Sequence, residues 1–62
     1  MTVDLDDRYS VTVRADGPRK AIGTIIDRST QGVVHKVIGE GRVLSAAQKR
    51  AVAAARAWVL SN

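Results

Sequence analysis

The stretch that decides the fold is SAAQKRAVAAARAWVL, which spans residues 45–60. It is rich in alanine and other strong helix formers, and it contains neither glycine nor proline. Its first four residues, Ser45 to Gln48, have the S-x-x-Q form of a capping box. In that device the serine oxygen accepts the amide of the glutamine, whose side chain reaches back to the amide of the serine. The sequence therefore predicts a helix that starts at Ser45 and ends near Leu60.

One side of this helix is expected to lie against the rest of the protein. Six residues share a stripe at 100° per residue: Ala47, Ala51, Val52, Ala55, Trp58 and Val59. Trp58 is the largest of them, so it should be the main anchor. Small side chains also gather on the opposite side: Ala46, Ala53 and Ala57, with Leu60. This second side is either an ordinary exposed surface, because alanine favours helix in water, or a surface that another helix or a nucleic-acid backbone approaches closely.

The residues before the helix predict three β-strands joined by tight turns. Residues 9–15 alternate between apolar and polar side chains, as a half-buried strand does. Residues 21–28 are rich in β-branched side chains, and residues 33–38 form a third strand after a polar turn. Gly17 and Pro18 favour a chain reversal between the first two strands. We therefore expect an α+β fold in which a three-stranded antiparallel meander packs against one C-terminal helix (β-β-β-α).

The length of the chain limits it to one small domain. Sixty-two residues hold a single core, which we place in residues 8–62, with residues 1–7 as an acidic N-terminal tail. No apolar run approaches the roughly 20 residues of a membrane span. We expect a cytoplasmic protein without a membrane segment. Small domains often rely on disulfides, a metal or a second subunit, and without cysteine the second subunit is the stabilising device left open.

Positive charge dominates the predicted domain. The chain has ten lysine and arginine residues and six acids, and three of the acids, Asp4, Asp6 and Asp7, lie in the predicted tail. Ten bases therefore face three acids in the remainder. Such an excess favours polyanionic partners, nucleic acid first and acidic protein surfaces or anionic lipid after it. The alternative is that the charge merely keeps a small protein in solution.

The sequence offers no catalytic or metal-binding constellation. The single histidine, His35, alternates with Val33 and Val37 along a predicted strand, which is typical of a structural position. One histidine without any cysteine gives too few ligands for a usual zinc site. Residues 39–41 (Gly-Glu-Gly) precede the helix as phosphate-binding loops do, but a lone G-x-G favours a turn. We therefore expect a binding protein, not an enzyme, with no metal and no cofactor.

The candidate binding residues are bases near the helix N-terminus and on the strands. The first amides of a helix carry the positive end of its macrodipole, so bases beside them favour phosphate. The predicted nucleic-acid contacts are Arg14, Arg19, Lys20, Arg28, Lys36, Arg42, Lys49 and Arg50. The two aromatic residues, Tyr9 and Trp58, are both expected to point inward. Contact with a duplex backbone therefore suits the chain better than base stacking on a single strand.

Several of these residues are similar to those of the double-stranded RNA-binding domain. Tyr9 followed by Gly-Pro at residues 17–18 resembles the tyrosine and the turn of that family's first strand pair. Gly-Glu-Gly-Arg at residues 39–42, followed by Ser45, resembles the G-x-G-x-S approach to its last helix. The alanines and tryptophan of residues 53–58 resemble that helix itself. The resemblance, which lacks the family's first helix, implies a β-β-β-α arrangement and binding to duplex RNA.

Two functions from different classes follow from these features. The leading hypothesis is a small nucleic-acid-binding domain that contacts duplex phosphates through the helix N-terminus and the strand bases. Basic strand faces would also suit a sheet inserted into a DNA major groove, as in the small DNA-binding domains of some integrases. The alternative is a homodimeric adaptor or a small inhibitor protein, of the kind that phages and mobile elements encode, with the second alanine-rich side as its interface. Adjacent Ile25 and Ile26 leave open whether the outer sheet face is basic or apolar.

Overall fold

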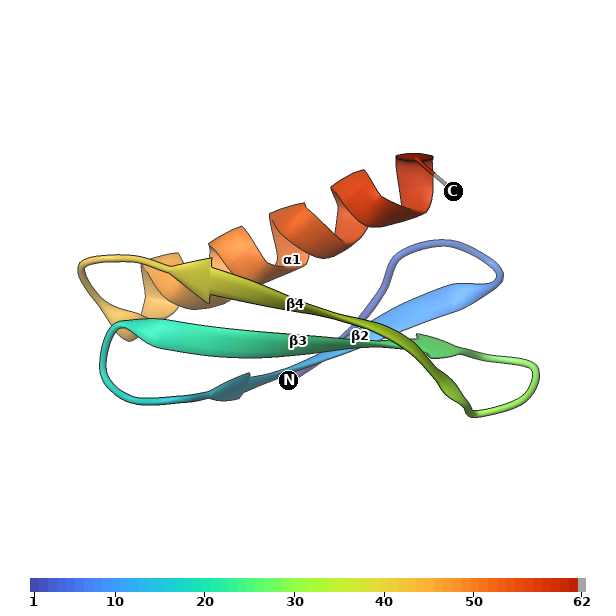
Figure 1. Cartoon of the computed structure of the whole chain (residues 1–62), viewed down its shortest axis with the longest axis horizontal. Helices are drawn as coiled ribbons and strands as arrows, with labels where there is room; N and C mark the ends of the chain where they lie inside the picture. Colours follow the sequence, from blue (N-terminus) through green and yellow to red (C-terminus); the bar gives the residue numbers. More distant parts are fainter. Residues whose placement is uncertain (62) are drawn as a thin grey trace.

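The computed structural model describes residues 1–61, which form a four-stranded antiparallel sheet with one helix across it (Figure 1). The strands are β1 (Thr2–Asp4), β2 (Tyr9–Ala15), β3 (Lys20–Asp27) and β4 (Val33–Glu40), and the helix is α1 (Leu44–Ser61). The strands pair in sequence order, β1-β2-β3-β4, so the sheet is a meander. The predicted α+β class, the antiparallel sheet and the C-terminal helix are confirmed.

The sheet has four strands, so the predicted number of three is wrong. The additional strand, β1, lies within residues 1–7, the segment expected to be a tail, and it pairs antiparallel with β2. Val3 faces Val11 in this pairing and packs against the core. The Met1 carbonyl accepts the Val13 amide at 2.7 Å, which extends the ladder to the first residue. No periodic pattern marks this strand, because three residues are too few positions to show one.

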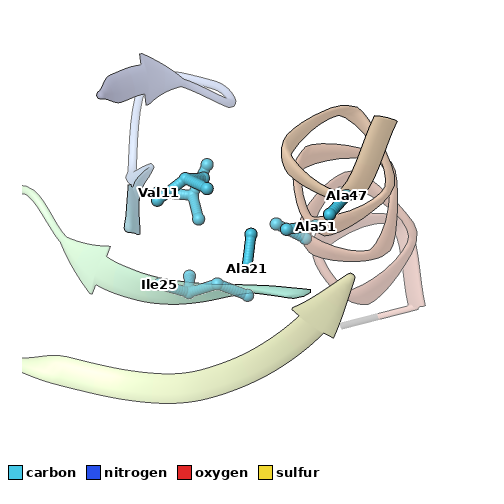
Figure 2. Packing of buried hydrophobic residues seen from close by; sticks show 7 residues of the cluster. Val11, Ala21, Ile25, Ala47 and Ala51 are labelled. Atoms are coloured by element: carbon cyan, nitrogen blue, oxygen red, sulfur yellow. The ribbon is translucent and has the colours of Figure 1, made fainter. Parts of the chain in front are cut away.

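The core is built largely from small side chains, and this brings the helix close to the sheet. Three alanines of α1 are fully buried: Ala47, Ala51 and Ala55. The largest fully buried side chains are Ile25 of β3 and Val11 of β2, which face each other across the sheet. Figure 2 shows these residues between the sheet and the helix. Opposite the alanines, Gly39 of β4 approaches the backbone of α1 so closely that no side chain fits between them.

The helix covers one face of the sheet and leaves the other open. Because Ile25 points toward the helix, its neighbours Ile22, Thr24 and Ile26 are directed to the opposite side, which we call the open face. Ile38 of β4 pairs with Ile22, so it lies on the open face too, and its side chain is exposed. The open face therefore carries the isoleucines of β3 and β4 on either side of the Thr24–Lys36 pair, so apolar and polar side chains alternate along it.

The C-terminal half of α1 is anchored by Trp58. Its ring stacks on His35 of β4 with ring centroids 5.3 Å apart and meets Tyr9 of β2 edge-on at 5.5 Å. Val52 of α1 also packs against the core. The inward direction expected for Tyr9 and Trp58 is found, and His35 supports the tryptophan from the helix side of the sheet.

The helix begins at Leu44, one residue earlier than predicted. The amide of Ala47 donates to the carbonyl oxygen of Val43 at 3.1 Å, which is the first bond of the helical ladder. Ser45 therefore lies inside the first turn instead of at the N-cap position. The predicted capping box is wrong, because its serine has to stand at the cap to accept the amide of Gln48.

The turn between β3 and β4 is organised by the carboxylate of Asp27, which is buried. Its Oδ1 accepts the hydroxyl of Ser29 at 2.7 Å and the amide of Ser29 at 2.9 Å. Arg8 Nε lies 3.5 Å from its Oδ2. The hydrogen bonds from Ser29, with a smaller contribution from Arg8, hold the pKa of Asp27 below its usual value despite the opposing effect of burial.

Acid should weaken the fold through this carboxylate. Because the pKa of Asp27 is lower in the folded protein than in the unfolded chain, its stabilising effect is complete above the unfolded value near 3.8. That effect is lost as the pH falls through the folded pKa. We expect the melting temperature, measured by circular dichroism, to decrease as the pH is lowered below about 4. Asp27→Asn should melt at a lower temperature at neutral pH and respond less to acid; an unchanged midpoint at pH 7 would contradict this role.

Candidate nucleic-acid interface

The turn between β2 and β3 and the loop between β4 and α1 lie at the same end of the molecule (Figure 1). The amide of Gly41 in the loop donates to the carbonyl oxygen of Arg19 in the turn at 3.0 Å. Arg50 Nη1 on α1 donates to the carbonyl oxygen of Glu40 at 3.0 Å. These bonds fix the N-terminus of the helix beside the β2–β3 turn, and we call this region the basic end.

Six of the ten bases lie at the basic end: Arg14, Arg19, Lys20, Arg42, Lys49 and Arg50. The first three come from β2, its turn and β3, and the other three come from the loop before α1 and its first turns. All six are exposed except Lys20, which is half-buried. Two acids accompany them, Asp16 and Glu40, and the Asp16 carboxylate lies 3.6 Å from Lys20 Nζ. The basic end is therefore a cap of cations that spans both the sheet and the helix.

The remainder of the protein carries no net charge. Its four bases are Arg8, Arg28, Lys36 and Arg56, and its four acids are Asp4, Asp6, Asp7 and Asp27. Since the basic end has six bases and two acids, the entire net charge of +4 belongs to it. The fold thus places the positive net charge of the chain at one end of the long axis and leaves the rest of the molecule without net charge.

The acids of the opposite end are held there by hydrogen bonds that shape its turns. Asp6 Oδ1 accepts the amides of Arg8 at 2.8 Å and Tyr9 at 2.7 Å, which closes the loop between β1 and β2. Asp27 does the same for the turn between β3 and β4. Arg28 in that turn donates from Nη1 to the carbonyl oxygen of Asp6 at 3.0 Å. The charge separation is therefore built into the turns and does not depend on flexible side chains alone.

The structure separates two of the eight predicted contact residues from the other six. Arg28 lies at the opposite end beside the β1–β2 loop. Lys36 lies on β4, where it pairs with Thr24 on the open face. The position of Arg28 follows from the meander, because its successive turns alternate between the two ends of the sheet, whereas Lys36 lies along β4 between the two ends.

The four residues predicted for a partner interface lie on the outer side and one flank of α1. Ala53, Ala57 and Leu60 are exposed, and the leucine is the most exposed large apolar side chain of the described residues. Ala46 is half-buried because it packs over Gly41. A Cβ atom added to Gly41 would lie 2.8 Å from the Cβ of Ala46. None of these four contributes charge to the basic end.

A groove of about 430 Å³ runs between α1 and β1. It exists because one helix, about 10 Å wide, is narrower than a four-stranded sheet of roughly 19 Å. Met1 and Val3 line one wall, and Gln48, Val52 and Arg56 contribute to the other. The groove identifies the flank of α1 that faces β1, so the opposite flank of the helix points beyond β4.

Within residues 1–61, no three histidine or acidic side chains gather in a way that could hold a metal ion. In the same range, no helix has both the length and the apolar character needed to cross a membrane. Comparison with protein-family models, with curated proteins and with solved structures finds no match. The charge distribution and the exposed surfaces of the chain itself are therefore the basis for assigning a function.

Proposed function

We propose that this protein binds duplex nucleic acid through the phosphate backbone, with the basic end as its contact surface. One observation carries the proposal: the whole net charge of +4 is concentrated at the basic end, and the opposite end is neutral. Evenly spread bases would keep the protein in solution equally well. A concentrated positive potential attracts a polyanion and orients it on arrival, which even spreading does not.

The placement of the bases suits a duplex. The molecule measures 33 × 20 × 15 Å, and the basic end is one tip of its long axis (Figure 1). Bases from both the sheet and the helix surround this tip, so they can reach phosphates on both sides of a groove about 12 Å wide. The first turn of α1 contains no acid, and its free amides add the positive end of the helix dipole.

Contact with the backbone fits this surface better than reading of bases. The two aromatic residues, Tyr9 and Trp58, pack against each other in the other half of the molecule, so neither offers a stacking platform at the basic end. Lysine and arginine contacts to phosphate position a protein on a duplex without reading its sequence. The proposed activity is therefore binding with little sequence preference and without a catalytic step.

Binding should depend steeply on salt. If about four of the six bases contact phosphates, a plot of log affinity against log salt concentration has a slope of about −3.6 on duplex DNA. Fluorescence anisotropy with two labelled duplexes of unrelated sequence should give this slope and similar affinities for both. Parallel titrations with duplex RNA distinguish the two nucleic acids. Absence of binding at about 50 mM salt, or a slope near zero, would overturn the proposal.

A further inference from the structure

The edge of the sheet formed by β4 is long and open, and half of its exposed side chains are apolar. The sheet order leaves β1 and β4 at the edges, and β1 has three residues whereas β4 has eight. Three of the six exposed large hydrophobic residues within 1–61 lie on β4: Val33, Val34 and Ile38. Natural sheets usually shorten, charge or cover such an edge, because its peptide groups pair readily with another strand.

We propose that two copies of this protein associate through β4. The strands pair antiparallel about a two-fold axis at Ile38, which joins the two meanders into one eight-stranded sheet with both helices on the same face. The occupant of the open edge is thus a second copy of the chain. This dimer does not rest on nucleic-acid binding, since none of its contacts involves phosphate.

The direction of the peptide groups limits how two β4 strands pair. In an antiparallel sheet, successive residues of a strand direct their peptide groups alternately to the two sides. The Gly41 amide donates to Arg19 on the β3 side, so the peptide groups of Lys36, Ile38 and Glu40 point to the open edge. An inter-copy ladder therefore pairs these even-numbered residues with one another.

Among these registers, the one about Ile38 is self-complementary. In this register Ile38 of one copy lies opposite Ile38 of the other, and Lys36 of each copy lies opposite Glu40 of the other. The two lysines and two glutamates all lie on the open face. Ile22 already pairs with Ile38 within each chain, so a row of four isoleucines would cross the dimer. A register about Lys36 would place like charges together, and a register about Val37 would set Lys36 against isoleucine.

The helix side of the edge leaves room for the second copy. Arg50 holds one lone pair of the Glu40 carbonyl oxygen, and a carbonyl accepts two hydrogen bonds, so the amide of the second copy's Lys36 can take the other. The flank of α1 that points beyond β4 carries Arg50, which reaches the Glu40 carbonyl, and the small residues Ala46 and Ala57. Because alanine is small, a second helix can approach these two positions at the usual spacing of about 8–10 Å, while the Arg50 guanidinium stays at the Glu40 carbonyl.

Sedimentation equilibrium of the full chain tests the dimer. At a chain concentration of roughly 0.5 mM, where even a weak interface is populated, we expect twice the single-chain mass of 6.6 kDa. Ile38→Lys places two lysines at the axis and should raise the dissociation constant by at least about tenfold. Leu60→Lys, which adds the same charge at another exposed apolar residue, should leave the dimer intact. A single-chain mass for the wild type, or equal effects of both substitutions, would overturn the proposal.

A charge exchange tests the register in particular. Lys36→Glu sets two glutamates against each other on both sides of the axis and should weaken the dimer. Adding Glu40→Lys in the same chain restores opposite charges across the interface, so the double variant should associate more tightly than Lys36→Glu alone. Circular dichroism of each variant confirms that the monomer is folded. A double variant that associates no better than the single one would rule out pairing about Ile38.

Discussion

A variant that carries both Arg19→Glu and Arg42→Glu should lose about 100-fold in affinity for a duplex at roughly 0.1 M salt. Both residues are exposed, and they lie in the two connections that meet at the basic end. Each reversal removes one cation from the contact surface and adds an anion that repels phosphate. The slope of log affinity against log salt concentration should also become shallower, by about one unit for each phosphate contact removed.

The matched control is a variant with Arg28→Glu and Arg56→Glu. These arginines are also exposed, and reversing them lowers the net charge from +4 to zero, as the first pair does. They lie away from the basic end, where Arg28 contacts the β1–β2 loop and Arg56 lies beside the groove. Anisotropy titrations should therefore show a much smaller loss for the control. Equal losses would mean that total charge, and not the basic end, governs binding.

The elements with a periodic signal were predictable from the sequence, and the shortest strand was not. The helix and the strands β2, β3 and β4 each show an apolar pattern or a run of β-branched residues long enough to identify them. β1 has three residues and is held by its pairing with β2, including the bond between Met1 and Val13. A strand that depends on such a non-local partner leaves almost no trace in its own residues.

The orientation of the isoleucines in β3 shows a second limit of sequence reading. Alternation along a strand tells which residues share a face, but adjacent Ile25 and Ile26 give both faces an apolar residue. Packing decides between them, because Ile25 meets Val11 under the helix whereas Ile26 is left half-buried on the open face. The same choice places Ile22 and Ile26 on the open face beside Thr24, which no count of charges indicated.

Only part of the spatial grouping of the candidate contact residues could be predicted from the sequence. Successive turns of a meander lie at opposite ends, so the predicted topology already separates Arg28 in the second turn from Arg19 in the first. The same alternation returns the start of α1 to the end of the first turn, but the direction in which α1 then runs, which keeps Lys49 and Arg50 at this end, is set by contacts between residues far apart in the sequence, such as the bond from Arg50 to Glu40. The basic end is therefore a property of the folded chain.

Replacing Gly39 by alanine should be the most damaging of the small substitutions in this protein. A Cβ at this position would overlap the carbonyl oxygen of Ala47 and the amide nitrogen of Ala51, both in the backbone of α1. No side chain can rotate away to make room, so the whole helix must move off β4. We expect a loss of about 3 kcal/mol or more, which is large for a domain with a total stability of about 5 kcal/mol. Urea unfolding followed by far-ultraviolet circular dichroism measures it.

Gly32→Ala is the appropriate comparison, because the nearest atom to its added Cβ is the hydroxyl oxygen of the exposed Thr30 at 3.2 Å, and moving it costs only the hydrogen bond that it accepts from the Gly32 amide. The stability should change by about 1 kcal/mol or less. Similar stabilities for both variants would contradict the close contact between helix and sheet. That contact also positions the basic end, since Glu40 follows Gly39 directly, Arg42 comes two residues later and Arg50 bonds to the Glu40 carbonyl. A folded fraction of Gly39→Ala should therefore bind a duplex more weakly than Gly32→Ala, although neither variant changes a charge.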